Sequence, residues 1–345
     1  MEADPFVDIV IPTWNGRELL EPCLKSIVGQ SYKRFQITVV DNGSTDGTVS
    51  FLQEEFPDVQ VVSFPVNTGF SVAVNAGIQA GTHPLIFLLN NDTELAPDCL
   101  EQLVDASLLN SHQFFAAKML SFQNRTLLDG AGDSYLRGGA GYRLGTMEPD
   151  GGVYDEQREV FGACAGAALY RRSFFEIVGR FDEDFFAYLE DVDLNLRANR
   201  RGLRCLFVPG ARVYHVGSAT TGSKINSVTV RLSTRNSFFV LLKNYSPKVF
   251  FRFLPAIVVY QVCWLLFCLK RKQFAAYLQG LAAVIPFLAK LRTKYRASRE
   301  NELSTIDTAA ILAKAEREVV DSIMRRRRDA GKNNLLLKWY GKLFL

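Results

Sequence analysis

The chain has 345 residues, 48% of them apolar, which is enough for one large domain with an appendage or for two domains. Residues 1–240 carry 20 Lys and Arg against 29 Asp and Glu, whereas residues 241–345 carry 20 against 7, so the rear part is expected to meet a negatively charged surface. The six cysteines have no CxxC or metal-ligand spacing, and the acidic N-terminus lacks a signal-peptide segment. These features argue against a disulfide framework, and the first domain is expected to stay in the cytosol.

Apolar strand patterns alternate with helical spacing over the first 110 residues. Strands are predicted at 6–12, 35–40, 59–64 and 84–92, and helices at 19–30, after Gly47 through Leu52, at 69–81 and at 97–110. This alternation predicts an α/β fold with a mostly parallel sheet and helices on both faces.

The pattern changes after Phe114. Residues 128–152 are rich in glycine and predict loops or a hairpin, and no internal repeat is present. Further along, the sequence predicts a strand at 161–171, a helix at 190–201, short strands at 204–208 and 212–215, and a helix at 227–244.

The rear part contains two apolar stretches, 253–269 and 274–291, flanked by basic residues. Both are shorter than the ~20 apolar residues of a spanning helix, and a hairpin would export Lys270 and its basic neighbours against the positive-inside rule. We therefore expect helices in the membrane interface, with cations on lipid phosphates; a buried helical subdomain is the alternative. An amphipathic helix at 304–328 ends in arginines, and 335–345 is a candidate second anchor.

The apolar run that begins at Pro84 ends in Asn90, Asn91 and Asp92. Open α/β sheets bind ligands at the carboxyl ends of their strands, so Asp92 is placed to hold a divalent cation that in turn holds a diphosphate. The alternative is that Asp92 or Thr93 caps a helix starting near Pro97.

Polar loops follow the first three predicted strands. They contain Pro12, Thr13 and Asn15, then Asp41 and Ser44, then Asn67, Phe70 and Asn75. Each loop alone is compatible with an ordinary turn, but parallel strands aim all three at one crevice, which favours a nucleotide site. The chain has neither GxxxxGK[ST] nor GxGxxG after the first strand, so phosphates would be held by a metal and scattered donors.

A second acidic cluster contains Glu190, Asp191 and Asp193 and follows an aromatic run at the start of a predicted helix. Helix capping is one interpretation. The other is a general base, because an apolar wall raises the pKa of a carboxylate toward neutral pH. His215 ends a short strand and is either a structural residue or a second metal ligand.

These stretches resemble the family 2 glycosyltransferases with the GT-A fold, in particular the bacterial rhamnosyltransferase-like branch. The matching segments run in the family's order over roughly residues 7–240 and include VIPTWNG at 10–16, VVDNGSTDG at 39–47, NTGF at 67–70, LLNND at 88–92, GRFDE at 179–183 and YLEDVDL at 188–194.

The resemblance implies an inverting transfer from a nucleotide-diphospho-sugar, with Asp191 as catalytic base and Glu190 beside it as a second catalytic candidate. Asp92 and His215 would hold Mg²⁺ or Mn²⁺. The nucleotide-sugar site would comprise Pro12, Thr13, Asn15, Asp41, Ser44, Asn67, Phe70, Asn75 and Asn91. One departure is Asn90, which replaces the first Asp of the family's DxD motif and removes one negative charge from the site.

We therefore expect a GT-A catalytic domain at 1–240, membrane-interface helices at 241–300 and a basic amphipathic tail at 301–345. The expected partners are a nucleotide-diphospho-sugar donor, a lipid-linked glycan acceptor and an anionic membrane surface, with no nucleic acid. The expected location is the cytoplasmic face of the plasma membrane, as a peripheral or monotopic protein. The rival hypotheses are a non-catalytic membrane scaffold, favoured by Asn90, and a sugar nucleotidyltransferase, which would need a better triphosphate loop.

Overall fold

The computed structural model describes residues 4–217, 225–297 and 303–345. The chain forms two compact units. Unit 1 comprises Met1–Asp133, Gly145–Phe186 and Arg204–Gly222, and unit 2 comprises Ser134–Leu144, Ala187–Leu203 and Ser223–Leu345. The expected domain boundaries near 240 and 300 stay a prediction.

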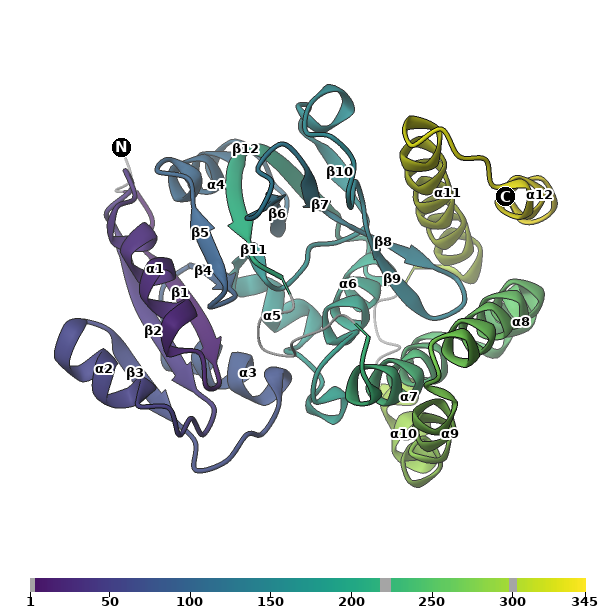
Figure 1. Ribbon diagram of the computed structural model, residues 1–345, viewed down its shortest axis with the longest axis horizontal. Helices are drawn as coiled ribbons and strands as arrows, with labels where there is room; N and C mark the ends of the chain where they lie inside the picture. The colour runs from purple at the N-terminus through teal and green to yellow at the C-terminus, as the bar shows by residue number, and fades with distance from the viewer. Residues whose placement is uncertain (1–3, 218–224, 298–302) are drawn as a thin grey trace. The chain divides into compact units, whose positions relative to one another are not determined.

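Unit 1 is built around a twisted sheet (Figure 1). Its first half contains β1 (Val7–Thr13), α1 (Arg17–Val28), β2 (Phe35–Asp41), α2 (Thr48–Glu55), β3 (Gln60–Ser63), α3 (Phe70–Ala80), β4 (Leu85–Leu89), β5 (Thr93–Leu95) and α4 (Cys99–Leu109). Its second half contains β6 (Phe114–Ser121), β7 (Leu128–Ala131), η1 (Gly152–Tyr154), β10 (Arg158–Val160), β11 (Ala167–Arg171), α5 (Arg172–Val178), η2 (Glu183–Phe185) and β12 (Cys205–His215).

The strand order is β10-β12-β6-β11-β4-β1-β2-β3, with β5 added to β12 and β7 added to β6. Strands β1 to β4 are parallel, and β11 is antiparallel to both β4 and β6. Because β12 is parallel to β6, both run in the same direction as β4. The carboxyl ends of β1, β2, β4 and β12 therefore meet at one edge of the sheet.

Helices cover both faces of this sheet, as the alternating pattern predicts. On one face, Leu20 and Leu24 of α1 and Leu103 of α4 join the buried core with alternate residues of β1. On the other face, α3 approaches so closely that a Cβ on Gly77 would lie 2.2 Å from Val10 Cγ1. Helix α3 therefore needs glycine at this crossing.

The structure differs from the sequence prediction in the second half of unit 1. The two short strands expected at 204–208 and 212–215 are one strand, β12, with a register shift between Val208 and Arg212. Strand β6 and helix α5 were not predicted. Strand β6 is buried on both sides, so it lacks the polar alternation by which a strand is recognised.

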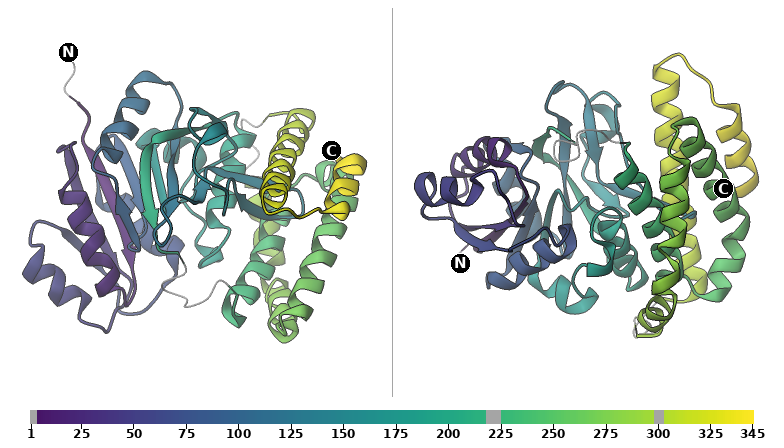
Figure 2. Two further views of the ribbon diagram at one scale, coloured as in Figure 1. Left: turned by 45° about the horizontal axis from the view of Figure 1, so that its top comes forward. Right: turned by 60° about the horizontal axis from the view of Figure 1, so that its bottom comes forward.

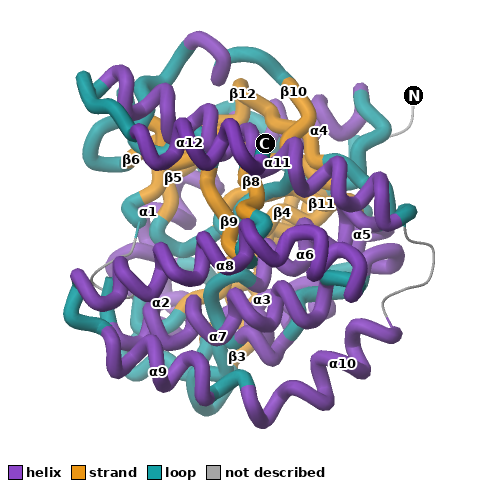
Figure 3. The backbone as a smooth tube through the Cα atoms, turned by 90° about the vertical axis from the view of Figure 1, so that its right-hand side faces the viewer, coloured by secondary structure: helices purple, strands orange, loops and turns teal. Residues whose placement is uncertain are grey.

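Unit 2 is mainly helical (Figure 2). It contains the hairpin of β8 (Asp133–Leu136) and β9 (Ala140–Arg143), then α6 (Glu190–Arg200), α7 (Ser227–Asn244), α8 (Pro247–Lys270), α9 (Phe274–Ala282), η3 (Ile285–Phe287), α10 (Leu288–Ala297), α11 (Thr305–Asp329) and α12 (Leu335–Phe344). Helix α7 packs against α9 and α10, and α8 packs against α9 (Figure 3).

Helix α8 is longer than the apolar run that predicts it. It begins at Pro247 because Ser246 caps it by accepting a hydrogen bond from the amide of Val249, and it extends to Lys270. Among the described residues, Pro247–Lys270 and Phe274–Arg296 are two segments long and apolar enough to cross a membrane, and only 22% and 28% of their most apolar windows are buried. The expectation that both are too short was wrong, since α8 and the segment formed by α9, η3 and α10 each extend beyond the apolar run that predicted them.

Helix α11 is fixed to the β8–β9 hairpin by buried polar contacts within unit 2. The guanidinium of Arg137 pairs with Glu316, and the Ser134 hydroxyl donates to the carbonyl of Ala315 at 2.8 Å. The apolar face of α11 therefore packs inside unit 2. In α12, by contrast, no residue is buried.

Candidate active site

The loops after β1 and β2 are joined by hydrogen bonds. The amide of Asn15 donates to Ser44 Oγ at 2.8 Å, and Asn15 Oδ1 accepts from the amide of Thr45 at 2.8 Å. Asn15 adopts a left-handed backbone with φ of 47°, which asparagine tolerates better than most residues. The predicted convergence of these two loops is confirmed.

Asp41 lies at the end of β2 and is buried. Its Oδ2 accepts a hydrogen bond from the amide of Ser44 at 3.3 Å. Within the described ranges, no hydrogen-bond partner reaches its buried Oδ1. A buried carboxylate oxygen is costly to leave unpaired, so this atom is suited to accept a hydrogen bond from a ligand.

The loop after β3 joins the same region through Asn42. The Asn42 side chain donates to Asn67 Oδ1 at 3.2 Å and accepts from the amide of Thr68 at 2.9 Å. Phe70, at the start of α3, stacks edge-on against Phe181. Asn75 lies further along α3, where its side-chain amide donates to the Phe181 carbonyl and to Glu183 Oε1. Both amide protons of Asn75 are therefore occupied within unit 1.

The turn after β4 packs closely against the β1 loop. Asn91 Nδ2 donates to Thr13 Oγ1 at 2.9 Å, and a Cβ on Gly16 would lie 2.3 Å from that nitrogen. Pro12 lies just before Thr13 and pairs in register with Val40 of β2. The backbone N–H of Asn90 donates to the carbonyl of Gly166, which lies just before β11.

Asp92 and His215 face each other at this edge of the sheet. Asp92 Oδ1 is 3.3 Å from His215 Nε2, and both side chains are 7% exposed. Burial alone would raise the pKa of Asp92, but hydrogen bonding and the charge of His215 outweigh it and hold the pKa below its ordinary value.

This spacing fits a shared cation. Ligand atoms at neighbouring corners of an octahedral cation with bonds of about 2.1 Å lie about 3 Å apart. The alternative that Asp92 or Thr93 caps the following helix is wrong, because the N-cap of α4 is Asp98 and Thr93 begins β5.

The acidic cluster of unit 2 separates into three environments on α6. Burial raises the pKa of Glu190 well above its ordinary value, and the adjacent charge of Asp191 raises it further. Asp191 Oδ1 accepts from the amide of Val192. Asp193 is fully buried and pairs with Arg197 at 2.9 Å and with Lys243 of α7 at 2.8 Å.

The residues before α6 are held in an unusual backbone conformation. Tyr188 and Leu189 have φ values of 71° and 65°, which are costly for side chains of this size. Asn236 of α7 donates from Nδ2 to the carbonyls of Ala187 and Tyr188 at 2.9 and 2.6 Å. Helix α7 therefore fixes the first turn of α6 through Asn236, which binds these carbonyls, and through Lys243 and Asn244, which bind the Asp193 carboxylate.

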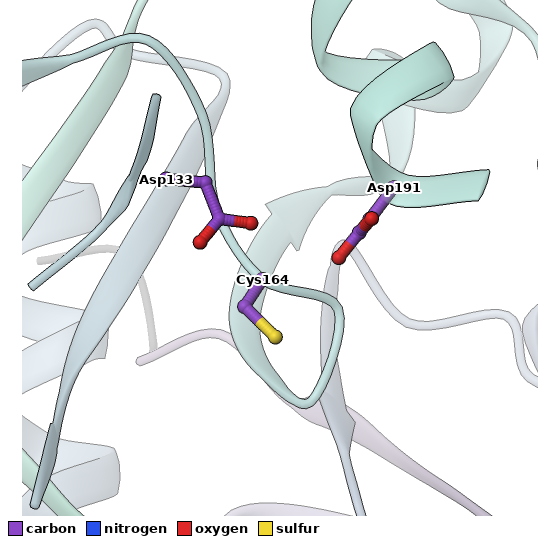
Figure 4. Close-up of side chains that lie close together, drawn as sticks. All are labelled: Asp133, Cys164 and Asp191. Carbon is purple, nitrogen blue, oxygen red and sulfur yellow. The ribbon is translucent and has the colours of Figure 1, made fainter. Parts of the chain in front are cut away.

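Figure 4 draws Asp191 on the first turn of α6, together with Asp133 and Cys164 of unit 1. A carboxylate oxygen of Asp133 and Cys164 Sγ lie within 4.8 Å of each other. Two ligands do not complete a metal site, so we assign no function to this pair.

Three residues that shape these environments were not predicted from the sequence. Asp129 contacts His215. Asn42 holds the loop after β3, and Asn236 holds the backbone before α6. Asn42 stands in the DNGSTDG loop and could have been noticed as an Asx turn. Asp129 and Asn236 carry no local signal.

Comparison with known proteins agrees with this architecture. The family model described as "Glycosyl transferase family 2" matches residues 8–179. An N-acetylglucosaminyl-diphospho-decaprenol L-rhamnosyltransferase of Mycobacterium tuberculosis is 28% identical over 242 residues, which cover 62% of this chain and 77% of the relative. The O-antigen biosynthesis protein RfbC of Myxococcus xanthus is 30% identical over 231 residues, which cover 64% of this chain and 18% of that protein.

Two solved structures share the fold at 17% identity. A mannosyltransferase of Pyrobaculum calidifontis, solved with GDP-Man and Mn²⁺, gives a TM-score of 0.50 over 94% of this chain and 88% of its own. GalNAc-T7, solved with UDP, GalNAc and Mn²⁺, gives a TM-score of 0.53 over 68% of this chain and 48% of its own. The chain is a nucleotide-sugar-dependent glycosyltransferase with the GT-A fold and belongs to glycosyltransferase family 2, in its rhamnosyltransferase-like branch.

Proposed function

We propose that this protein transfers a sugar, with inversion, from a nucleotide-diphospho-sugar to a lipid-linked glycan in cell-surface polysaccharide assembly. The observation that carries the proposal is the buried Asp92–His215 pair at the same sheet edge as the Asp41 oxygen that no described residue hydrogen-bonds. Rhamnose is the first candidate sugar, because the mycobacterial relative is named as a rhamnosyltransferase that acts on a decaprenol-linked acceptor.

The donor is assigned to the edge of the sheet in unit 1. Thr13, Asn15 and Asp41 hold the nucleoside, and Asp41 Oδ1 is the acceptor atom that a ribose hydroxyl or a base N–H would satisfy. The other residues proposed for this site are Pro12, Ser44, Asn67, Phe70, Asn75 and Asn91. Of these, Asn75 acts through the 181–183 segment that it holds.

Asp92 and His215 are proposed to hold Mg²⁺ or Mn²⁺. When bound there, the cation neutralises charge on the diphosphate leaving group. With Asn90 in place of a carboxylate, Asp92 is the anionic member of this pair, so diphosphate oxygens are expected to complete the coordination.

Asp191 is proposed to act as the general base. It accepts the proton of the acceptor hydroxyl, the hydroxyl oxygen forms a bond to the anomeric carbon, and the bond to the diphosphate oxygen breaks. The nucleoside diphosphate leaves with the electron pair of that bond. A single displacement of this kind inverts the anomeric configuration. Glu190, beside it, is buried and has a raised pKa, so it keeps its proton more readily than an exposed glutamate.

The acceptor is proposed to be reached at the cytoplasmic face of the plasma membrane. Helix α12 supports this, because Leu336 and Trp339 are 85% and 62% exposed while Lys338 and Lys342 stand among them. Apolar side chains beside lysines are typical of a helix lying in an anionic lipid interface.

The test is release of nucleoside diphosphate from UDP-, dTDP- and GDP-sugars by the full-length protein with a polyprenyl-diphosphate-linked glycan. Each donor is assayed with Mn²⁺, with Mg²⁺ and with EDTA, and the anomeric configuration of the product is determined by NMR. We expect metal-dependent release from one donor, with inversion. Release that persists in EDTA would contradict the metal assignment, and retention of configuration would contradict the single displacement.

A further inference from the structure

His215 lies between two carboxylates of unit 1. Its Nε2 is 3.3 Å from Asp92 Oδ1, and its Nδ1 is 2.8 Å from Asp129 Oδ2. The side chains of His215 and Asp92 are each 7% exposed, and that of Asp129 is 13% exposed. The imidazole therefore has an acidic group at each ring nitrogen, and only one of these groups, Asp92, belongs to the motif that the sequence reveals.

The shorter contact at Nδ1 decides the orientation of the ring. A neutral imidazole carries one proton, and the nitrogen without it presents a lone pair. If that lone pair faced Asp129 at 2.8 Å, it would repel the carboxylate, whereas an Nδ1 proton makes a charge-assisted hydrogen bond. In the neutral ring this leaves the Nε2 lone pair at the longer, 3.3 Å contact with Asp92, where it is available to a cation; only the protonated ring donates from both nitrogens.

Asp129 is itself held in place by backbone contacts. It belongs to β7, which pairs with β6 and shifts register between Met119 and Leu120. The Thr146 hydroxyl donates to the carbonyl of Asp129 at 3.0 Å. The carboxylate is thus positioned by a sheet strand, which holds a side chain more accurately than a loop does.

We propose that Asp129 is a positioning residue that accepts a hydrogen bond from Nδ1–H of His215 and so directs Nε2, with Asp92, at a divalent cation. Metal-binding histidines commonly donate their second N–H to a carboxylate, which fixes the tautomer and makes the ligand more basic. The inference rests on the proposed function only in assigning the cation to Asp92 and His215.

The first test is the protonation of His215. The chain has three histidines, so ¹⁵N-histidine labelling gives three imidazole spectra, and His215→Gln identifies the one that matters. In the metal-free, unaltered protein at alkaline pH, we expect a proton on Nδ1. In Asp129→Ala we expect Nδ1 to be bare. A bare Nδ1 in the unaltered protein would overturn the proposal without the need for any variant to fold.

The second test is Mn²⁺ affinity, followed through the EPR signal of free Mn²⁺. We expect Asp129→Ala to weaken binding by about 10- to 100-fold and Asp129→Asn, which keeps an acceptor oxygen, to weaken it less. The matched control is Glu159→Ala, which removes the carboxylate beside His112 in the same unit and should leave Mn²⁺ affinity unchanged.

The results separate this inference from the proposed function. If His215→Gln weakens Mn²⁺ binding but folded Asp129→Ala does not, Asp129 has no positioning role while the metal site stands. If His215→Gln also leaves Mn²⁺ affinity unchanged, both assignments fall. Weakened binding in both variants, with Glu159→Ala unaffected, supports the proposal.

Discussion

The two units of this molecule differ in architecture and in the residues that shape their proposed sites. Unit 1 uses a buried sheet whose strand ends are joined by short polar loops, and its proposed ligand atoms belong to Asp41, Asp92 and His215. Unit 2 uses helices with large exposed apolar side chains, and its acidic cluster is fixed by contacts between α6 and α7. On the proposed assignment, donor binding depends on unit 1 and the general base belongs to unit 2, so substitutions should disturb the two separately.

The largest effect should come from the proposed base in unit 2. Asp191→Asn keeps the shape of the side chain and removes its basicity, so turnover should fall by ~10²–10⁴-fold. Donor affinity, measured by calorimetry, should stay the same because it depends on unit 1. Near-normal turnover would rule out Asp191 as the base.

The buried ion cluster of unit 2 should matter for stability. Asp193→Asn removes the buried carboxylate that pairs with Lys243 and Arg197, so the free energy of unfolding should fall by ~3–5 kcal/mol in urea titrations. Asp58→Asn, at an exposed carboxylate of unit 1, is the control.

The stability difference between wild type and Asp193→Asn should also depend on pH. Burial opposes the charge of Asp193, but Lys243 and Arg197 outweigh it and hold the pKa of Asp193 below its ordinary value. An acid with a lowered folded-state pKa stabilises the protein above the unfolded-state pKa of about 4, and that stability is lost as the pH falls through the folded-state value. The difference between wild type and Asp193→Asn should therefore be full at pH 7 and should shrink below pH 4. A constant difference would show that charge pairing is not its source.

In unit 1, the corresponding substitution should act on binding. Asp41→Asn weakens the acceptor that we assign to the nucleoside, and a hydrogen bond to a charged group contributes ~1.5–3 kcal/mol, so donor affinity should fall by about 10- to 100-fold. Turnover at saturating donor should change little. A drop in turnover with unchanged affinity would place Asp41 outside the donor site.

A smaller effect is expected at the membrane. Replacing Leu336 and Trp339 by glutamate should lower binding of the full-length protein to anionic vesicles by at least about tenfold, because burial of both apolar side chains is lost. Leu109→Glu alters an equally exposed leucine of unit 1 and should have no effect. Equal loss in both proteins would show that α12 has no special role.

The smallest effect is expected for Glu190→Gln. Burial and the Asp191 charge raise the pKa of Glu190, and glutamine mimics the protonated acid, so turnover should change less than about tenfold. An acid with a raised folded-state pKa costs stability as the pH rises above its unfolded-state value of about 4.5. Glu190→Gln should therefore become more stable than wild type in urea titrations at high pH. A large loss of turnover would give Glu190 a direct catalytic role.

The sequence by itself determined the alternating strands and helices of residues 6–110, the three polar loops and the acidic strand end. These features follow from local periodicity and from the rule that parallel strands bring their carboxyl ends to one edge. It also predicted α6 and α7 closely, since the helices expected at 190–201 and 227–244 are observed at Glu190–Arg200 and Ser227–Asn244.

Only the tertiary structure decided which polar residues meet. Asp129 lies in a glycine-rich segment and reaches His215, 86 residues away, only because β7 and β12 both lie beside β6. Asn236 holds backbone carbonyls 48 and 49 residues earlier in the chain. The physical reason is that a periodic pattern records which face of an element is buried, whereas the partner of a polar group is set by strand order and helix packing over long distances in the chain.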